Sequence, residues 1–553
     1  MGGLRQRLSR LIGPEHPGTG AARRGKKPPA RGQRGGGGAA GVAVAKREKD
    51  LFHARQYGVR EDGGKACPSI RRAECLLSGG KTEGDVLSAI GGRIAQTLDA
   101  VGDTVSEAFF EPVLRLGVTG LSRAGKTVFI TALIHNLMEP GRMQRMRAIR
   151  EGLVRGVWLQ PQPDLTLPRF DYERHLAALT GPEPRWPEGT RAISEIRLSF
   201  RLAPSGLIGG LTGPRKLHLD IVDYPGEWLL DLGLMGKDYA TWSAEVLDRL
   251  PLRPEAGAFR AALGGLDPQA RHDEGVAQDL ARAFTAYLVA ARAAGWSDCT
   301  PGRFLLPGDL AGSPVLTFAP LPGAEGARGS LWREMARRFE GYKAQVIRPF
   351  FETHFARIHR QVVLVDVLDA LNRGPAALED QRRAMAEVLA AFRPGANGFF
   401  SSLLRGRRVE KVLFAATKAD HLHHSQHPRL TALAEAMLAE ARDRARFSGA
   451  ETAALAIAAL RSTVEETRSH AGREVEVVRG RLLDGRQVAV DAGELPLDPA
   501  RLLAPARQGT GDWGARYGVE RFAPPVIERA PGQGLPHVRL DAAAEFLIGD
   551  RLV

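Results

Sequence analysis

Short apolar runs alternate along most of this chain with segments whose apolar residues recur at helical spacing. The clearest run, 361–367, is rich in β-branched residues and predicts a strand buried on both faces. Residues 193–202 instead alternate apolar with polar positions, as an edge-type strand does. Strands separated by helices favour a mostly parallel, doubly wound α/β sheet. The expected strands are 113–118, 193–202, 216–222, 361–367, 409–416 and, with a weaker pattern, 455–460.

Helical periodicity fills most of the intervals between these runs, and a turn signal near the C-terminus adds a hairpin. Asp484 and Gly485 separate two β-prone segments, 475–483 and 487–490, which predicts two antiparallel strands. The final segment has the spacing of an amphipathic helix. The expected helices are 85–110, 128–137, 172–179, several within 239–294, 376–392, 428–447 and 540–552.

At 553 residues the chain is long enough for two to four domains. Residues 1–85 are a basic extension rich in Gly and Pro that we expect to be disordered, because it has too little apolar surface to bury. A P-loop α/β domain is expected in two parts, 86–235 and 346–470, around a mainly helical insertion. We assign that insertion to 236–345, and a small C-terminal α+β region to 471–553.

The composition, 43% hydrophobic and 25% charged, is that of a globular protein. The net charge of +14 comes mostly from residues 1–85, which hold 18 basic and 8 acidic residues, so no specific nucleic-acid site is expected in the body of the protein. The sequence has no apolar run of transmembrane length. Three cysteines without a metal-binding spacing fit a reducing, cytoplasmic setting.

Residues 120–127 read Gly-Leu-Ser-Arg-Ala-Gly-Lys-Thr and match the phosphate-binding P-loop, G-x-x-x-x-G-K-[ST]. The motif follows an expected strand and precedes an expected helix, which is the context that it requires. Lys126 would reach the β- and γ-phosphates, and Thr127 would be a ligand of Mg²⁺. The residues expected to bind phosphate are Gly120, Ser122, Arg123, Ala124, Gly125, Lys126, Thr127 and Val128.

A second motif, D-x-x-G, spans Asp223 to Gly226 and follows the expected strand 216–222. Asp223 would hold Mg²⁺ through water, and the Gly226 N–H would contact the γ-phosphate. The switch loop that supplies a further Mg²⁺ ligand must lie before residue 193. Thr190 and Ser194 are both placed well for this role, and we prefer Thr190.

The third motif, Thr417-Lys418-Ala419-Asp420, follows the expected strand 409–416 and matches the guanine-reading [NT]-K-x-D pattern. The Asp420 carboxylate can accept hydrogen bonds from the guanine ring N–H and its exocyclic amine, which adenine does not offer in that geometry. The Lys418 stem can lie over the base. Ala459 is the expected small residue of the loop that reaches the guanine oxygen.

The hydrolytic residues are less clearly marked. The position after D-x-x-G, where many GTPases carry Gln, is Glu227, and we therefore expect slow hydrolysis that a partner or dimerisation accelerates. Arg123, Arg185 and Arg191 are candidate arginine fingers. A histidine cluster follows the guanine motif (His421, His423, His424 and His427). We interpret it as a polar loop, because no carboxylate or cysteine partner for a metal is evident in the sequence.

Three blocks that hold these motifs, 116–127, 221–231 and 414–420, resemble the YcjX-like family of bacterial stress-associated P-loop proteins. The blocks 301–309, 369–374 and 535–550 resemble it as well, and the likeness covers the chain from about residue 85 onward. The resemblance implies a G domain with inserted helices, a further small domain and GTP binding. At Ala459 the chain departs from the family, which tends to have Ser there.

Together the motifs predict a cytoplasmic GTPase-type switch that binds GTP and GDP with Mg²⁺, with Lys126, Glu227 and Thr190 in catalytic roles. The expected partners are a guanine nucleotide and a protein effector or activator, with a homodimer as a further option. Two alternatives remain: an ATPase of the P-loop class, and a nucleotide-dependent scaffold with little hydrolysis, at membranes or nucleic acid through the basic extension.

Overall fold

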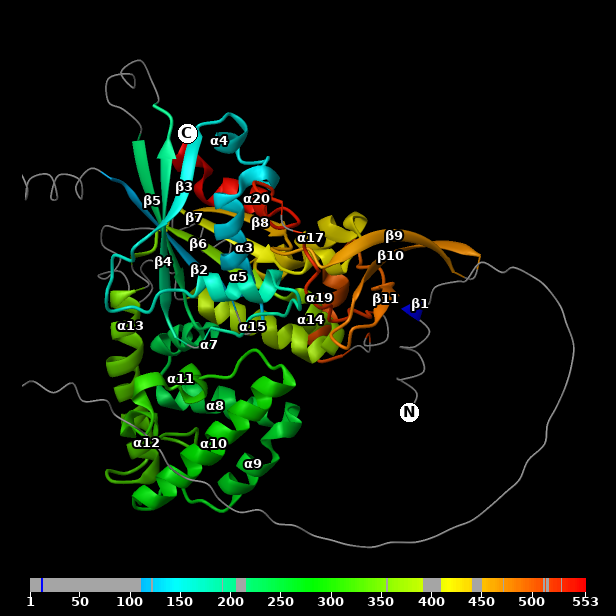
Figure 1. Cartoon of the computed structure of the whole chain (residues 1–553). Helices are drawn as coiled ribbons and strands as arrows, with labels where there is room; N and C mark the ends of the chain where they lie inside the picture. Colours follow the sequence, from blue (N-terminus) through cyan, green and yellow to red (C-terminus); the bar gives the residue numbers. More distant parts are fainter. Residues whose placement is uncertain are drawn as a thin grey trace, which may run out of the picture. The chain divides into compact units, whose positions relative to one another are not determined.

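A seven-stranded sheet with helices on both faces forms the centre of the protein (Figure 1). No helix in the part of the chain that the structure describes is long and apolar enough to cross a membrane. The computed structural model describes residues 11–12, 111–120, 123–190, 192–204, 215–354, 357–390, 409–439, 450–470, 472–510, 513, 517–528 and 530–553.

The sheet is mostly parallel, which confirms the predicted α/β class. β5, β2, β6, β7 and β8 pair in parallel, and the two strands at one end, β3 and β4, pair antiparallel. In spatial order the strands are β3 (Val154–Gln160), β4 (Ser194–Leu202), β5 (Arg215–Asp223), β2 (Val113–Gly120), β6 (Arg360–Val365), β7 (Lys411–Ala416) and β8 (Glu451–Ala456).

Side chains of the central strand β6 alternate between two hydrophobic cores, one on each face of the sheet. Val362 and Leu364 belong to one core, and Val363 and Val365 belong to the other. This explains why residues 362–365 of this strand are all apolar. Helices on the first face are α3 (Lys126–Met138), α4 (Arg147–Arg150), α5 (Tyr172–Thr180), α20 (Leu540–Ala544), the π-helical turn η11 (Glu545–Gly549) and α21 (Asp550–Leu552). Those on the second face include α14 (Val367–Arg373), α15 (Pro375–Ala390), α17 (His427–Met437) and α19 (Ala500–Arg507).

The second core continues into a group of helices between β5 and β6, which lies below the sheet in Figure 1. Its centre is aromatic: Trp242 stacks on Phe339, with ring centroids 4.9 Å apart. Capping side chains start its longer helices; Asp273, for example, accepts a hydrogen bond from the Val276 N–H. The elements are α7 (Gly226–Leu230), η2 (Asp231–Gly236), α8 (Tyr239–Arg249), η3 (Leu250–Leu252), η4 (Pro254–Ala256), α9 (Gly257–Gly264), α10 (Glu274–Ala294), α11 (Gly302–Leu305), η5 (Gly308–Leu310), η6 (Pro314–Leu316), α12 (Leu331–Tyr342), η7 (Lys343–Ile347) and α13 (Arg348–Thr353).

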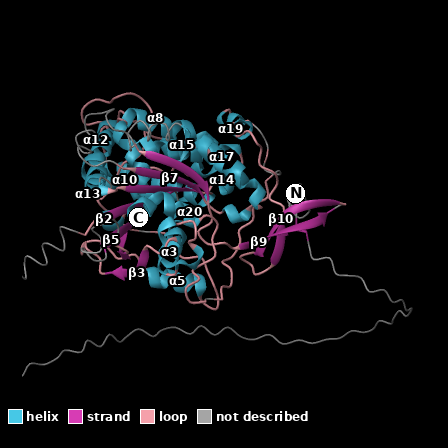
Figure 2. Cartoon of the chain, turned by 90° about the horizontal axis from the view of Figure 1, so that it is seen from above, coloured by secondary structure: helices cyan, strands magenta, loops and turns pink. Residues whose placement is uncertain are grey.

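A second, antiparallel sheet of four strands contains the predicted hairpin (Figure 2). Gly485 turns the chain with φ 89°, which favours glycine. β9 was not predicted, because its polar residues give no apolar run. In spatial order the strands are β1 (Leu11–Ile12), β11 (Gln487–Val490), β10 (Arg473–Arg481) and β9 (Thr463–His470).

Several predicted elements differ from those observed. β4 is not an edge strand, because the unpredicted β3 pairs along it within a proline-rich stretch. β6 ends at Val365 because Asp366 caps the unpredicted helix α14, accepting a hydrogen bond from the Asp369 N–H at 3.1 Å. β8 begins four residues before the strand predicted at 455–460. The predicted helix 85–110 and residues 440–447 of the predicted helix 428–447 lie outside the described residues.

Helix α11 touches α7 so closely that only glycine fits at Gly302. A Cβ atom there would lie 1.9 Å from the Glu227 carbonyl oxygen and 3.0 Å from the Trp228 nitrogen, both backbone atoms. We expect Gly302→Ala to lower the stability of the protein by about 1–3 kcal/mol or more, because backbone cannot move aside cheaply. Thermal and denaturant unfolding would measure this.

The matched control is Gly341→Ala in α12, where a Cβ atom would meet nothing within 4 Å. That change should be neutral or stabilising by up to about 1 kcal/mol, because alanine favours helix. Equal stabilities for the Gly302 and Gly341 variants would contradict the close packing of α11 on α7.

Candidate nucleotide-binding site

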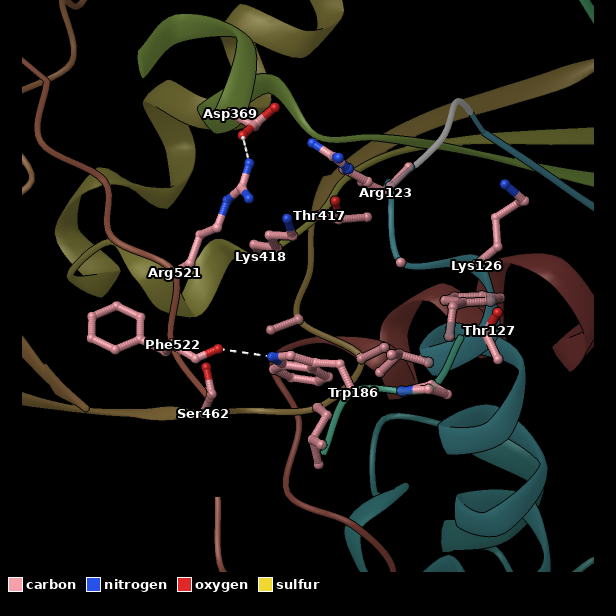
Figure 3. Close-up of a pocket in the computed structure, with 18 of the residues that line it drawn as sticks. Arg123, Lys126, Thr127, Trp186, Asp369, Thr417, Lys418, Ser462, Arg521 and Phe522 are labelled. Carbon is pink, nitrogen blue, oxygen red and sulfur yellow. Dashed lines mark hydrogen bonds and ion pairs between the residues drawn. The ribbon is translucent and has the colours of Figure 1, made fainter. Parts of the chain in front are cut away.

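The parallel strands end at one edge of the sheet, where open α/β sheets bind their ligands. A cavity of about 510 Å³ lies there, and it brings together the P-loop and the guanine motif (Figure 3). Thr190 lines the same cavity. The residues that line it include Arg123, Ala124, Gly125, Lys126, Thr127, Val128, Trp186, Thr190, Arg292, Asp369, Thr417, Lys418, Asp420, Ala459, Ser462, Arg521 and Phe522.

The P-loop connects β2 to α3 as its motif requires. Gly125 has φ 84° and precedes the first residue of α3, and Arg123 has φ 67°, so the loop curls tightly. A side chain at Gly120 would meet the Leu364 carbonyl oxygen at 2.6 Å, so only glycine fits between β2 and β6. The Lys126 ammonium donates a hydrogen bond to the Gly120 carbonyl at 3.0 Å and is almost fully buried. Ser122 lies outside the described residues.

The three residues predicted to bind Mg²⁺ line one hollow beside the P-loop: Thr127, Thr190 and Asp223. Ser194, the alternative to Thr190, lines it too. The Thr190 hydroxyl donates to Asp223 Oδ2 at 2.5 Å, whereas Asp223 Oδ1 is buried and has no hydrogen-bond partner among the residues that the structure describes. Burial raises the pKa of the Asp223 carboxyl to about 6, against the lowering effects of Lys126 and Thr190. A buried carboxylate oxygen with no donor, next to two hydroxyls, fits a hard divalent cation.

The guanine motif follows β7, and two of its side chains have fixed partners: Lys418 forms an ion pair, and Asp420 accepts hydrogen bonds. Lys418 has φ 59°, and its ammonium pairs with the Asp366 carboxylate at the end of β6. Asp420 is buried, and its Oδ2 accepts hydrogen bonds from the Ser462 N–H and hydroxyl, each at 2.7 Å. These bonds orient the Asp420 carboxylate within the cavity. Sequence reasoning missed Ser462, which carries no motif of its own.

The loop predicted to reach the guanine oxygen also lines the cavity. Ala459 lines it and lies three residues after Ala456, the last residue of β8. Its neighbour Ala458 forms a two-way backbone bridge to Val538, with N–O distances of 3.0 and 2.8 Å. The C-terminal segment thus holds the loop in place through Ala458, while the next residue, Ala459, lines the cavity.

Two further pairs of residues at the cavity had no sequence signal, because their partners come from distant parts of the chain. The Trp186 indole donates to the Phe522 carbonyl at 2.8 Å, and Arg521 pairs with Asp369 at 3.2 Å (Figure 3). Trp186 lies in the loop that carries Thr190, so this loop is joined to the C-terminal segment across the cavity mouth.

Gly226 and Glu227 open α7 and do not line the main cavity. Glu227 is buried and pairs with Arg292 of α10 at 2.5 Å; both line a small hollow that adjoins the P-loop. Arg292 lines the main cavity as well, and the sequence analysis did not identify it. Of the arginines that it did name, Arg123 lines the main cavity, Arg185 lines the hollow beside Asp223, and Arg191 lies outside the described residues.

The segment after Gly226 is fastened to the helical insertion by buried polar contacts. The Trp228 indole donates to the Leu306 carbonyl at 3.1 Å, and the Arg303 guanidinium lies over its ring. Asp231 accepts hydrogen bonds from the Gly302 N–H at 2.7 Å and the Tyr342 hydroxyl at 2.5 Å. Burial raises the pKa of the Asp231 carboxyl to about 7, and these two donors oppose the rise. A movement of the D-x-x-G loop would therefore displace the residues of the insertion that contact Trp228 and Asp231.

A P-loop on a mostly parallel sheet, with its sequence motifs collected at one strand edge, defines the fold as a P-loop G domain with a helical insertion. Comparison with known proteins agrees. The model of the YcjX-like family, DUF463, matches residues 114–552, and the chain belongs to this family. The resemblance inferred from the sequence is thereby confirmed.

The chain matches two curated relatives over nearly their whole lengths. The chain is 40% identical over 461 residues to a protein of Escherichia coli (strain K12) named Ras-like GTPase YcjX, covering 79% of this chain and 96% of that relative. It is 35% identical over 468 residues to a protein of the same name from Shewanella oneidensis, covering 79% and 94% respectively.

The raised pKa of Asp223 predicts a pH-dependent cost of keeping its carboxylate buried. Because the pKa is about 6 in the folded protein and about 3.9 in an unfolded chain, this carboxyl stabilises the fold only at low pH, and stability falls as the pH rises through 6. In buffer free of metal and nucleotide, Asp223→Asn should therefore stabilise the protein by about 3 kcal/mol at pH 8 and about half of that at pH 5.

Unfolding midpoints across pH 5 to 8 would test this, with Asp279→Asn as the control. Asp279 is exposed and pairs with Arg282 at the surface, so its variant should show no such pH dependence. A difference between Asp223→Asn and the wild type that does not grow between pH 5 and 7 would contradict the burial of an ionised Asp223.

Proposed function

We propose that this chain is a GTPase-type molecular switch that binds GTP and GDP with Mg²⁺ and hydrolyses GTP slowly. The observation that supports it most is that Asp420 and Lys126, a base-reading carboxylate and a phosphate-binding lysine, line the same cavity. The names of the two relatives support a GTPase-type function too.

In this proposal Asp420 selects the base and the P-loop binds the phosphates. Ser462 occupies one oxygen of Asp420 and turns the carboxylate, so the other oxygen and the remaining lone pairs can accept from guanine. A base that lacks those donors would leave a buried charge unpaired, which costs several kcal/mol. Thr127, Thr190 and Asp223 would hold Mg²⁺, which supplies positive charge at the β- and γ-phosphates when bound.

Nucleotide competition tests the choice of base. GTP should displace labelled GDP at least about 100-fold more effectively than ATP does, and Asp420→Ala should remove most of that preference. The matched control is Asp369→Ala, because Asp369 also lines the cavity but pairs with arginines at its edge. Equal displacement by ATP and GTP in the wild type would overturn the guanine assignment in favour of an ATPase.

For hydrolysis we propose that Arg292 and Glu227 act as a pair. Water attacks the γ-phosphorus, the bond from phosphorus to the β–γ bridging oxygen breaks, and GDP and phosphate leave. Arg292 can reach from the hollow of Glu227 toward the main cavity, because it lines both, and would neutralise charge on the γ-phosphate. Glu227, released from this pair, would orient the attacking water; Lys126 stays on the phosphates.

Arg292→Ala should lower the rate of GTP hydrolysis by about 100-fold or more, since arginine fingers in related chemistry contribute about 10³ to 10⁵. GDP affinity should change little, because the arginine acts on the γ-phosphate. The control is Arg282→Ala on the same helix, where the side chain is exposed. Multiple-turnover phosphate release measures both, and an unchanged rate in Arg292→Ala would remove this arginine from the mechanism.

We further propose that the insertion at 236–345 and the C-terminal region at 471–553 report the nucleotide state to a protein effector or activator, or to a second copy of the chain. Trp228 and Asp231 support the first route, because both connect the D-x-x-G segment to the insertion. The stress association implied by the family and a cytoplasmic setting are part of this proposal. Cys299, a free and buried thiol, fits that setting.

A further inference from the structure

Two adjacent histidines beyond the guanine motif meet carboxylates that the sequence could not connect to them. His423 and His424 lie in the turn η10 (His424–Gln426) and the residue before it. Glu465 lies on β9 and Glu476 on β10, two strands that follow the histidines in the sequence. The register pairs Glu476 with Thr467, two residues beyond Glu465, so both glutamates are on the same face of the sheet.

The nitrogen and oxygen atoms of this cluster converge as metal ligands do. His424 Nδ1 lies 2.7 Å from Glu465 Oε2, and His423 Nε2 lies 3.8 Å from the same oxygen. One ligand atom from each of His423, His424 and Glu465 lies within 4.8 Å of the other two. Small rotations of the exposed His424 side chain would place all three around one ion, with a further position open to water.

The other nitrogen of His423 has partners that prepare the ring for a metal. His423 Nδ1 lies 3.0 Å from the Ser425 hydroxyl and 3.1 Å from Glu476, and that hydroxyl donates to Glu476 at 2.5 Å. The Ser425 N–H also approaches Nδ1, but at 3.5 Å, whereas the Glu476 carboxylate lies at 3.1 Å and can only accept. The closer carboxylate favours a proton on Nδ1, which leaves the lone pair of Nε2 facing Glu465. A carboxylate on the far nitrogen of a ligating histidine is the usual support of a zinc site.

We propose that His423, His424 and Glu465 form a binding site for a divalent transition metal of the zinc class, with Glu476 orienting His423. Two imidazoles and one carboxylate suit zinc or cobalt better than magnesium or calcium, which prefer oxygen ligands. His421 and His427 do not belong to the site: His421 lines the nucleotide cavity, and His427 Nε2 donates to the Ala419 carbonyl at 2.7 Å.

A metal here would crosslink two segments that contact Asp420: the turn that contains the histidines and the start of β9. β9 begins directly after Ser462, whose N–H and hydroxyl bond to the Asp420 carboxylate, and Thr463 donates to the Asp420 carbonyl. The histidines follow Asp420 on the other side. The metal site does not depend on the proposed GTPase function, and it can be tested without nucleotide.

The experiment titrates zinc into the untagged, full-length, chelator-treated protein, in nucleotide-free buffer with excess Mg²⁺, and follows binding by calorimetry. Cobalt absorption gives a second readout of nitrogen ligation. We expect one zinc per chain that His424→Ala and Glu465→Gln each weaken by about 100-fold or more, and that Glu476→Gln weakens by about 10- to 100-fold. His470→Ala, an exposed histidine at the end of β9, should bind zinc as the wild type does.

Unfolding midpoints in chelator should be equal for the wild type and all four variants, which checks that the chain still folds. The site is refuted if His424→Ala and Glu465→Gln bind zinc as tightly as the wild type, or if His470→Ala loses the same zinc. It is also refuted if the wild type binds no zinc, whatever its affinity for GTP.

Discussion

Parallel pairing of β5, β2, β6, β7 and β8 places the carboxyl ends of five strands along one edge of the sheet. Every motif of the candidate site follows one of these strands, so the register of the sheet decides which loops can meet. The contact at Gly120 is a tight point of this arrangement, since any side chain there would strike the backbone of β6. A shift between β2 and β6 would displace the P-loop from the guanine motif, because β2 carries the first loop and β7, which pairs with β6, carries the second.

The site contains three buried carboxylates, and their hydrogen-bond and ion-pair partners differ. Asp420 is satisfied by Ser462, and Glu227 is paired with Arg292, so both are held in one orientation before any ligand arrives. Asp223 keeps one buried oxygen without a donor in the described part of the chain, which makes the nucleotide-free protein less stable at neutral pH. A bound cation with its nucleotide would neutralise the buried Asp223 carboxylate, and this binding would stabilise the fold.

Much of the fold could be predicted because its signals are local. The strands β2, β5, β6 and β7 are buried on both faces, and this burial makes their sequences rich in apolar residues, although buried polar residues such as Asp220 and Gln361 interrupt them. Elements with half-buried or polar faces escaped detection, as β3 and β9 did. β4 resembled an edge strand because the alternation of its sequence cannot reveal that another strand pairs beside it.

The sequence by itself determined the α/β class, the family, and the three motifs whose spacing and context mark a nucleotide site. Motifs are readable because their residues are neighbours in the chain and serve a fixed local geometry. Only the tertiary structure decided that Ser462 holds Asp420, that Arg292 reaches Glu227 from the helical insertion, and that Glu465 faces His424. Each of these contacts joins residues more than 40 positions apart, and no local pattern records a partner that packing alone brings near.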